Sequence, residues 1–108
     1  MLERGMRKPE IEAELAKRGE FVQIDYLTRF LKKDTPLDVK KFCYEKLAQI
    51  YEKKSMFSEA AKSYEGLAIL AIPFTEKMIW YVKEAEAFIK AGFFERADDA
   101  VKKAVSQA

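Results

Sequence analysis

The chain has 108 residues, of which 49% are hydrophobic and 35% charged, and its formal net charge is +2. This is the composition of a globular protein with one modest core, and it excludes a disordered chain. Residues 1–54 hold 13 Lys and Arg against 10 Asp and Glu, and residues 55–108 hold 7 against 8. So small an imbalance does not predict a nucleic-acid-binding face.

The cysteine content and the hydropathy set further limits. Cys43 is the only cysteine and there is no histidine, so an internal disulfide is excluded and a reducing compartment is expected. No apolar run is long enough to span a membrane, and the first residues lack the apolar core of a signal peptide. We therefore expect a cytoplasmic protein without membrane insertion.

Two helices are predicted before residue 34. Residues 1–8 form a charged lead-in, and Pro9 suits the first turn of the first helix, where its missing N–H costs nothing. Gly19 is expected to end this helix, and the second helix begins near Phe21. The predicted inward positions are the apolar ones at helical spacing: Ile11, Leu15 and Ala16 in the first helix, and Ile24, Leu27, Thr28 and Leu31 in the second.

The third and fourth helices are predicted over residues 37–54 and 57–71. Thr35 is expected to cap the third helix, with Pro36 at its first position. Gly66 lies inside the fourth helix, where glycine costs roughly 1 kcal/mol relative to alanine. We expect a neighbouring helix to approach closely at this glycine.

The fifth helix is expected to be capped by Thr75 and ended by Gly92, and the sixth begins near Phe93. The predicted inward positions are again apolar: Met78, Tyr81, Val82, Ala85, Phe88 and Ile89 in the fifth helix, and Phe94, Ala97, Val101 and Ala104 in the sixth. No stretch alternates with a period of two, so no strand is predicted.

The helices repeat in pairs. The segments 17–21, 53–57 and 90–94 each carry an aromatic residue four positions after a lysine. Ile24, Ala60 and Ala97 then follow at intervals of 36 and 37 residues. A helical hairpin recurring at this period predicts an all-α protein, a right-handed α-solenoid of about three antiparallel hairpins and six helices. We predict one domain over residues 1–108, with hairpins at about 9–33, 37–71 and 75–107.

The last two hairpins resemble the tetratricopeptide repeat, a helix–turn–helix unit with aromatic and small residues at fixed positions. The matching residues are Tyr44, Leu47, Ala48, Tyr51, Ala60, Tyr64 and Leu67, and then Tyr81, Ala85, Phe88, Ala97, Val101 and Ala104. The first unit matches through Leu15, Gly19 and Ile24. The period is longer than the 34 residues of that family, so the chain also resembles the longer hairpin repeats of SNAP-type vesicle-fusion adaptors.

The resemblance implies a concave groove lined by the first helix of each hairpin. The residues that match the groove positions are Phe42, Glu45, Gln49, Glu52 and Lys53, followed by Ile79, Val82, Glu86, Ile89 and Lys90. The implied function is that of a scaffold that binds another protein or peptide in the groove or at the ends of the solenoid. The family's clamp for a peptide carboxylate is not expected, because Glu45 and Gln49 stand where it uses Lys and Asn.

Three alternatives remain open from the sequence. The basic doublets, such as Lys40-Lys41 and Lys53-Lys54, suggest RNA binding as the second hypothesis. The apolar C-terminal helix suggests self-association or end-on binding of a partner. Trp80 is either packing between repeats or a binding hot spot.

No catalytic role is predicted. Cys43 has no histidine to activate it, so a small buried hydrophobe is the simpler interpretation. The carboxylates Glu84 and Glu86 are expected to be solvated surface charges. No metal-ligand cluster or phosphate-binding glycine loop is present in the sequence, so no cofactor or metal is expected.

Overall fold

A computed structural model describes residues 7–32 and 34–107. These residues form six α-helices and no strand, as predicted. The helices are α1 (Lys8–Ala16), α2 (Glu20–Leu31), α3 (Leu37–Lys53), α4 (Phe57–Leu70), α5 (Phe74–Ala91) and α6 (Phe94–Val105). Most of the predicted lead-in, residues 1–6, lies outside the described residues. No described helix combines the length and the hydropathy needed to cross a membrane.

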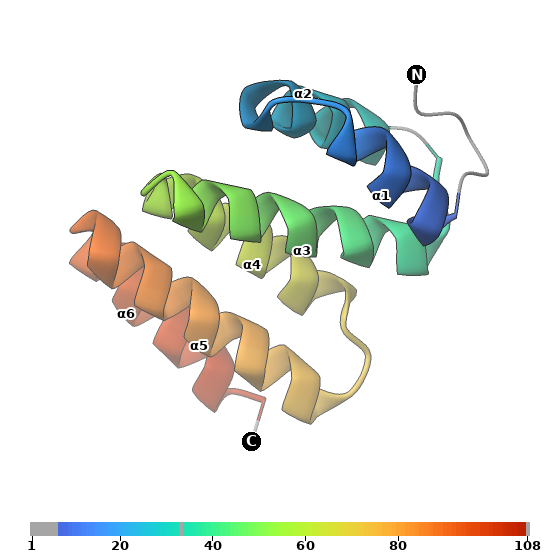
Figure 1. The fold of residues 1–108 in the computed structure, drawn as a ribbon. Coiled ribbons are helices and arrows are strands. Elements are labelled where there is room, and N and C mark those ends of the chain that lie inside the picture. The colour runs from blue at the N-terminus through green and yellow to red at the C-terminus, as the bar shows by residue number, and fades with distance from the viewer. Residues whose placement is uncertain (1–6, 33, 108) are drawn as a thin grey trace.

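From α2 onward the helices pack pairwise in chain order, and α1 joins them through Ile11 and Leu15, which share a core with α2 and α3. Figure 1 shows α3 and α4 side by side in the middle, with α1 and α2 on one side and α5 and α6 on the other. Each of α2 to α5 packs against the helix that follows it. The second helices begin at Glu20, Phe57 and Phe94, so they start 37 residues apart both times. By this register the residue equivalent to Ala60 and Ala97 is Gln23, one position before the predicted Ile24.

Helix α3 belongs to two cores. One of its faces packs Val39, Cys43, Leu47 and Ile50 against Ile11, Leu15, Leu27 and Phe30 of α1 and α2. The other brings Ala48, Tyr44 and Tyr51 against α4, in a cluster that continues to Ala87 and Phe88 of α5 and Ala97 of α6. Burying each large aliphatic or aromatic side chain contributes about 1.5–3 kcal/mol. The shared helix therefore joins the N-terminal hairpin to the other two.

The threonine caps predicted for α3 and α5 are wrong. Pro36 and Pro73 directly precede these helices, and neither helix has a side-chain cap. The carbonyl oxygens of Pro36 and Pro73 accept hydrogen bonds from the N–H groups of Lys40 and Lys77, both at 3.0 Å. The fixed φ of proline suits this position. Thr35 is instead buried, and within the described structure its hydroxyl oxygen has no hydrogen-bond partner.

The turns inside the hairpins also differ from the prediction. Gly92 ends α5 as expected, with φ at +83°. Gly19 does not end α1, which stops at Ala16; Gly19 is extended, with φ at −68°, and directly precedes α2. The residue equivalent to Gly92 is Ser55, 37 positions earlier, which also has a positive φ of 58°. The left-handed turn position is therefore shared by the second and third hairpins, with serine in one and glycine in the other.

Several predicted core positions are at the surface. Phe94 and Val101 of α6 are 67% and 45% exposed, because α6 packs against α5 through Ala97, Ala100 and Ala104. The predicted inward residues Ala16, Val82 and Ile89 are exposed as well. Several buried residues were not predicted, among them Phe30, which is 1% exposed, and Glu84, which is 3% exposed. Only the alanines of α6 are buried against α5, because their small side chains let the two helices approach closely. The larger apolar residues beside them stay exposed.

Candidate protein-binding groove

The ten predicted groove residues lie on α3 and α5, the first helices of the second and third hairpins. On α3, Glu45, Gln49 and Lys53 are exposed, and Phe42 and Glu52 are half-buried. All five groove residues on α5 are exposed. The structure thus leaves this face of both helices accessible, as a binding groove requires.

Ion pairs tie α3 to α5 at both ends. Near the start of the two helices, Lys41 Nζ lies 3.4 Å from Glu76 Oε1. Near their ends, Lys90 Nζ lies 3.5 Å from Glu52 Oε1. Exposed ion pairs are worth about 0.2–1 kcal/mol each, so they align the two helices more than they stabilise them. Two predicted groove residues, Glu52 and Lys90, are therefore paired with each other across the groove.

Glu52 is held from a second side. The hydroxyl of Tyr64, on α4, donates a hydrogen bond to Glu52 Oε2. Burial and this hydrogen bond raise the pKa of the Tyr64 hydroxyl, because both favour the protonated form. The ring of Trp80 on α5 stacks on the ring of Tyr64, with the two ring centroids 5.9 Å apart. Trp80 thus packs between the second and third hairpins.

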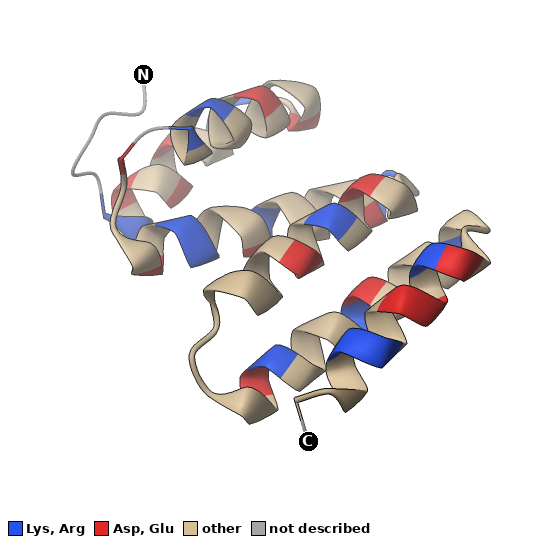
Figure 2. Ribbon diagram, turned by 180° about the vertical axis from the view of Figure 1, so that it is seen from behind, with Lys and Arg blue, Asp and Glu red and all other residues tan. Residues whose placement is uncertain are grey.

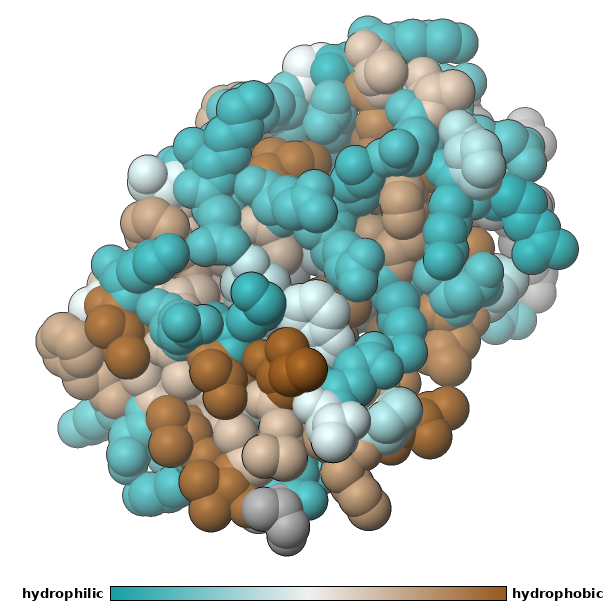
Figure 3. Space-filling model, turned by 60° about the horizontal axis from the view of Figure 1, so that its bottom comes forward, coloured by the Kyte–Doolittle hydropathy of each residue, from teal (hydrophilic) through white to brown (hydrophobic). Residues whose placement is uncertain are grey.

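The α5 half of the groove is apolar. Ile79, Val82 and Ile89 are 56%, 47% and 52% exposed. Ile79 and Val82, with Met78 and the stem of Lys83, border a shallow hollow of about 470 Å³. In Figure 3 hydrophobic side chains gather over the lower part of the molecule, on the C-terminal hairpin, whereas hydrophilic residues cover most of the upper part. An accessible apolar surface of this kind is typical of a protein-binding site.

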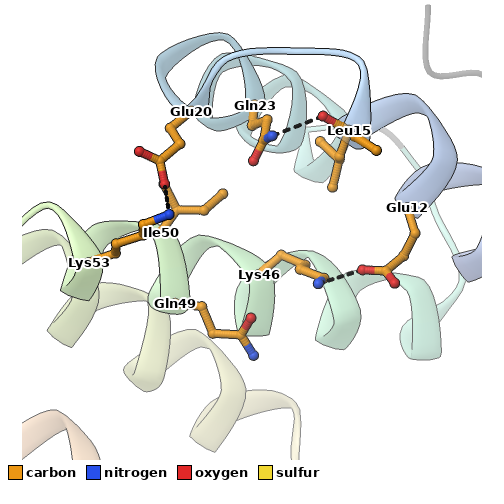
Figure 4. Close-up of a pocket in the computed structure, with 9 residues that line it drawn as sticks. Glu12, Leu15, Glu20, Gln23, Lys46, Gln49, Ile50 and Lys53 are labelled. Carbon is orange, nitrogen blue, oxygen red and sulfur yellow. Dashed lines mark hydrogen bonds and ion pairs between the residues drawn. The ribbon is translucent and has the colours of Figure 1, made fainter.

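The α3 half of the groove borders a different hollow. A space of about 370 Å³ lies between α3 and the N-terminal hairpin, with Gln49 and Lys53 on its α3 side (Figure 4). Lys53 Nζ lies 3.0 Å from Glu20 Oε2, and Lys46 pairs with Glu12 across the hollow. Hydrogen bonds from Lys53 and Lys54 lower the pKa of Glu20, which keeps it charged. The lysines of this hollow are therefore already paired within the protein.

Sequence reasoning missed the partners that line this second hollow. Glu12, Glu20 and Gln23 come from α1 and α2, and Gln23 Nε2 donates to the carbonyl oxygens of Leu15 at 2.9 Å and Arg18 at 2.8 Å. The signal for Gln23 was the 37-residue register, which places it where the later hairpins have alanine. No local pattern indicated that α1 lies across α3.

Two of the candidate reactive side chains, Cys43 and Glu84, are buried. Cys43 is fully buried, and burial raises the pKa of its thiol to about 12. The carboxyl of Glu84 is also buried rather than solvated, which corrects the prediction; Lys103 Nζ lies 3.3 Å from its Oε1. Within residues 7–32 and 34–107, no three His, Cys, Asp or Glu side chains are grouped to hold a metal ion.

Positive and negative residues alternate over the surface. Figure 2 shows basic and acidic positions interspersed along the helices seen from behind. Several basic doublets are engaged with carboxylates: Lys53 and Lys54 both pair with Glu20, and Lys103 pairs with Glu65 at 2.8 Å. These pairings reduce the positive charge available to a polyanion.

No family model, no curated protein and no solved structure matches this chain.

Proposed function

We propose that this protein is an interaction scaffold that binds a segment of another protein along the groove of α3 and α5. The observation that supports the proposal is the row of exposed apolar side chains on α5, Ile79, Val82 and Ile89. Full burial of such a side chain contributes roughly 1.5–3 kcal/mol, and each of the three is about half exposed, so about half of that remains to be gained for each. A partner that covers them would recover part of this free energy.

The segment that fits best is an amphipathic one. The hollow of about 470 Å³ beside Ile79 and Val82 has room for apolar side chains, and Lys83, Glu86 and Lys90 on the same helix are exposed. An amphipathic helix laid in a groove uses apolar anchors at helical spacing and polar contacts at the edge. We therefore propose a partner segment with two or three apolar anchors flanked by charges of both signs.

As part of the same proposal, the hairpins are of the tetratricopeptide kind or of the longer SNAP-type kind. The constant interval of 37 residues between the starts of α2, α4 and α6 supports a repeat. We also propose that the protein works in the cytoplasm, where a free thiol such as that of Cys43 remains reduced.

Peptide selection tests the groove. A display library of amphipathic peptides is selected against the immobilised wild-type chain, and the affinities of the selected peptides are measured by fluorescence anisotropy. Val82→Glu places a charge among the apolar anchors and should weaken binding at least tenfold. Val22→Glu is the matched control, because Val22 is 51% exposed but lies on α2. Selected peptides that bind Val82→Glu as tightly as the wild type would count against the groove.

Salt dependence distinguishes the RNA alternative. RNA affinity falls steeply with salt, by about 10³–10⁵-fold between about 50 and 200 mM for six to ten phosphate contacts. Binding of a peptide to Ile79, Val82 and Ile89 should change little over this range. Tight, salt-sensitive binding of a single-stranded RNA oligonucleotide, unaffected by Val82→Glu, would favour the RNA alternative instead.

A further inference from the structure

The outer side of α4, which the third hairpin covers, can be compared with the outer side of α6, because equivalent residues of the two helices lie 37 positions apart. In the second hairpin, Tyr64 and Ala68 of α4 are covered by the third hairpin: Tyr64 stacks on Trp80, and Ala68 packs with Tyr81 and Ala104. Their equivalents on α6 are Val101 and Val105, which are 45% and 66% exposed. The outer side of α6 is therefore the uncovered counterpart of the interface between hairpins.

This uncovered face is more apolar than its internal counterpart. On α3, Lys41 and Glu52 make the ion pairs to α5, and the residues at the equivalent positions of α5 are Met78 and Ile89. Apolar residues thus stand on α5 at the two positions where α3 has charged ones. We call the surface formed by these residues the terminal face: Met78 and Ile89 on α5, and Phe94, Asp98, Val101, Lys102 and Val105 on α6.

The apolar composition of the terminal face determines which kind of surface can pack on it. Suppose that a further hairpin docked here with charged residues equivalent to Glu76 and Lys90 of α5. Its charges would face Met78 and Ile89, which cannot form ion pairs. Burying unpaired charges is costly. A second apolar face carries no such penalty, and an identical face is the simplest one available to the protein.

We propose that a second copy of this chain docks on the terminal face, with its α6 antiparallel to the first. A twofold axis near the level of Ala100 places Phe94 of each copy close to Val105 of the other, with the two Val101 side chains on either side of the axis. A twofold interface is self-complementary, because residue i contacts j and j contacts i. The uncovered stripe of α6 has this symmetry, with apolar residues at both ends and a valine near the centre.

The charges beside the stripe also match under the twofold axis. Asp98 and Lys102 lie on the same side of α6, 3.0 Å apart within one copy. In the antiparallel arrangement, Asp98 of each copy comes next to Lys102 of the other, so two pairs of opposite charge form across the interface. Complementary charges of this kind fix the register of an interface more than its affinity.

The groove and the terminal face meet on α5, because Ile89 belongs to both and Met78 of the terminal face borders the groove hollow. Ile79 and Glu86 lie in the groove alone. The dimer is tested by a different readout from peptide binding, so the two proposals can fail separately. Sedimentation velocity of the full chain, from low to high micromolar concentration, should show a monomer–dimer equilibrium. A monomer throughout would overturn the proposal and leave the terminal face for a different protein; growth beyond a dimer would overturn the twofold geometry.

Charge-reversal variants test the register. Asp98→Lys alone puts the introduced lysine against Lys102 of the other copy, and Lys102→Asp alone puts two aspartates together, so each variant should be monomeric. An equimolar mixture should associate again, because each interface charge then meets its opposite. Circular dichroism checks that both variants stay helical. Dimers of either variant alone, or no association in the mixture, would overturn the antiparallel register.

Cross-linking gives an independent check. Val101→Cys places two thiols near the twofold axis, so mild oxidation should produce a covalent dimer, while the buried Cys43 stays unmodified. Val22→Cys, on the exposed side of α2, is the control and should cross-link far more slowly. Equal cross-linking of the two variants would contradict the proposal.

Discussion

The ring of Tyr44 on α3 lies against the backbone of Gly66 on α4. A Cβ at Gly66 would meet Tyr44 Cε1 at 2.6 Å and Cζ at 2.7 Å, which is closer than carbon atoms pack. This confirms the close helix approach predicted at Gly66, and it explains why a glycine stands in the middle of a helix. Helices α3 and α4 can approach this closely because Gly66 has no side chain.

Gly66→Ala should therefore destabilise the protein, although alanine is the better helix former. We expect a loss of about 1–3 kcal/mol from overpacking against the tyrosine ring, measured by urea denaturation. In a Tyr44→Leu background the ring is gone, so adding Gly66→Ala should be neutral or slightly stabilising. The same loss in both backgrounds would show that the tyrosine ring is not the cause.

The left-handed turn positions predict opposite effects for two substitutions. Gly92 has φ at +83°, so Gly92→Ala should lose about 1–2 kcal/mol by forcing an L-residue into this conformation. Ser55 has φ at 58°, so Ser55→Gly should gain stability at the equivalent turn. Thermal melts of both variants check this. Gly19→Ala is the control: its φ is −68° and no atom lies within 4 Å of the added Cβ, so no loss is expected.

Ala60 tests the packing of the second hairpin. It is 0% exposed in the cluster formed by α3, α4, α5 and α6. Ala60→Leu should overpack this cluster and lower the free energy of unfolding by about 1–3 kcal/mol. Ala13→Leu is a matched change at an exposed position of α1, and it should have little effect. Equal stability of the two variants would place Ala60 outside the core.

Glu84 predicts a pH-dependent stability. Burial raises the pKa of its carboxyl, against the opposing effect of Lys103. Since the folded pKa lies above the unfolded one, the fold favours the protonated form. The penalty for the charged form is absent below the unfolded pKa and grows as the pH rises toward the folded pKa.

Glu84→Gln should accordingly raise the melting temperature at neutral pH. The gain should shrink as the pH falls toward the ordinary pKa of a glutamate, because the wild-type carboxyl then becomes protonated as well. Lys103 keeps its ion pair with Glu65 in the variant. Glu86→Gln, an exposed position on the same helix, removes the same charge and is the control. A lower melting temperature for Glu84→Gln at neutral pH would show that the ion pair with Lys103 outweighs the burial.

Cys43 should be unreactive in the folded protein. Its pKa of about 12 and its complete burial leave almost no accessible thiolate, and the thiolate is the nucleophile. Iodoacetamide at neutral pH should label Cys43 only after urea is added, as detected by mass spectrometry. Rapid labelling without denaturant would mean that α3 separates readily from the N-terminal hairpin.

The sequence by itself determined the six helices and, to within a few residues, where they begin and end. Apolar residues at intervals of three and four define a helix and one stripe on it, and this signal needs no knowledge of the neighbours. Gly66 even indicated a close helix contact, because a helix-interior glycine calls for a compensating interaction. Cys43 could be assigned to the core for a similar reason, since it lacked any group to activate it.

The tertiary structure decided which apolar stripes are covered. Val101 and Tyr64 occupy equivalent positions in equivalent helices, yet only Tyr64 has a hairpin against it. Burial depends on contacts between segments far apart in the chain, and these do not appear in the local spacing of residues. For the same reason the sequence predicted that Glu84 is a surface charge, although α4 and α6 enclose it. The hollow beside Lys53 could not be predicted either, because it depends on where α1 lies across α3.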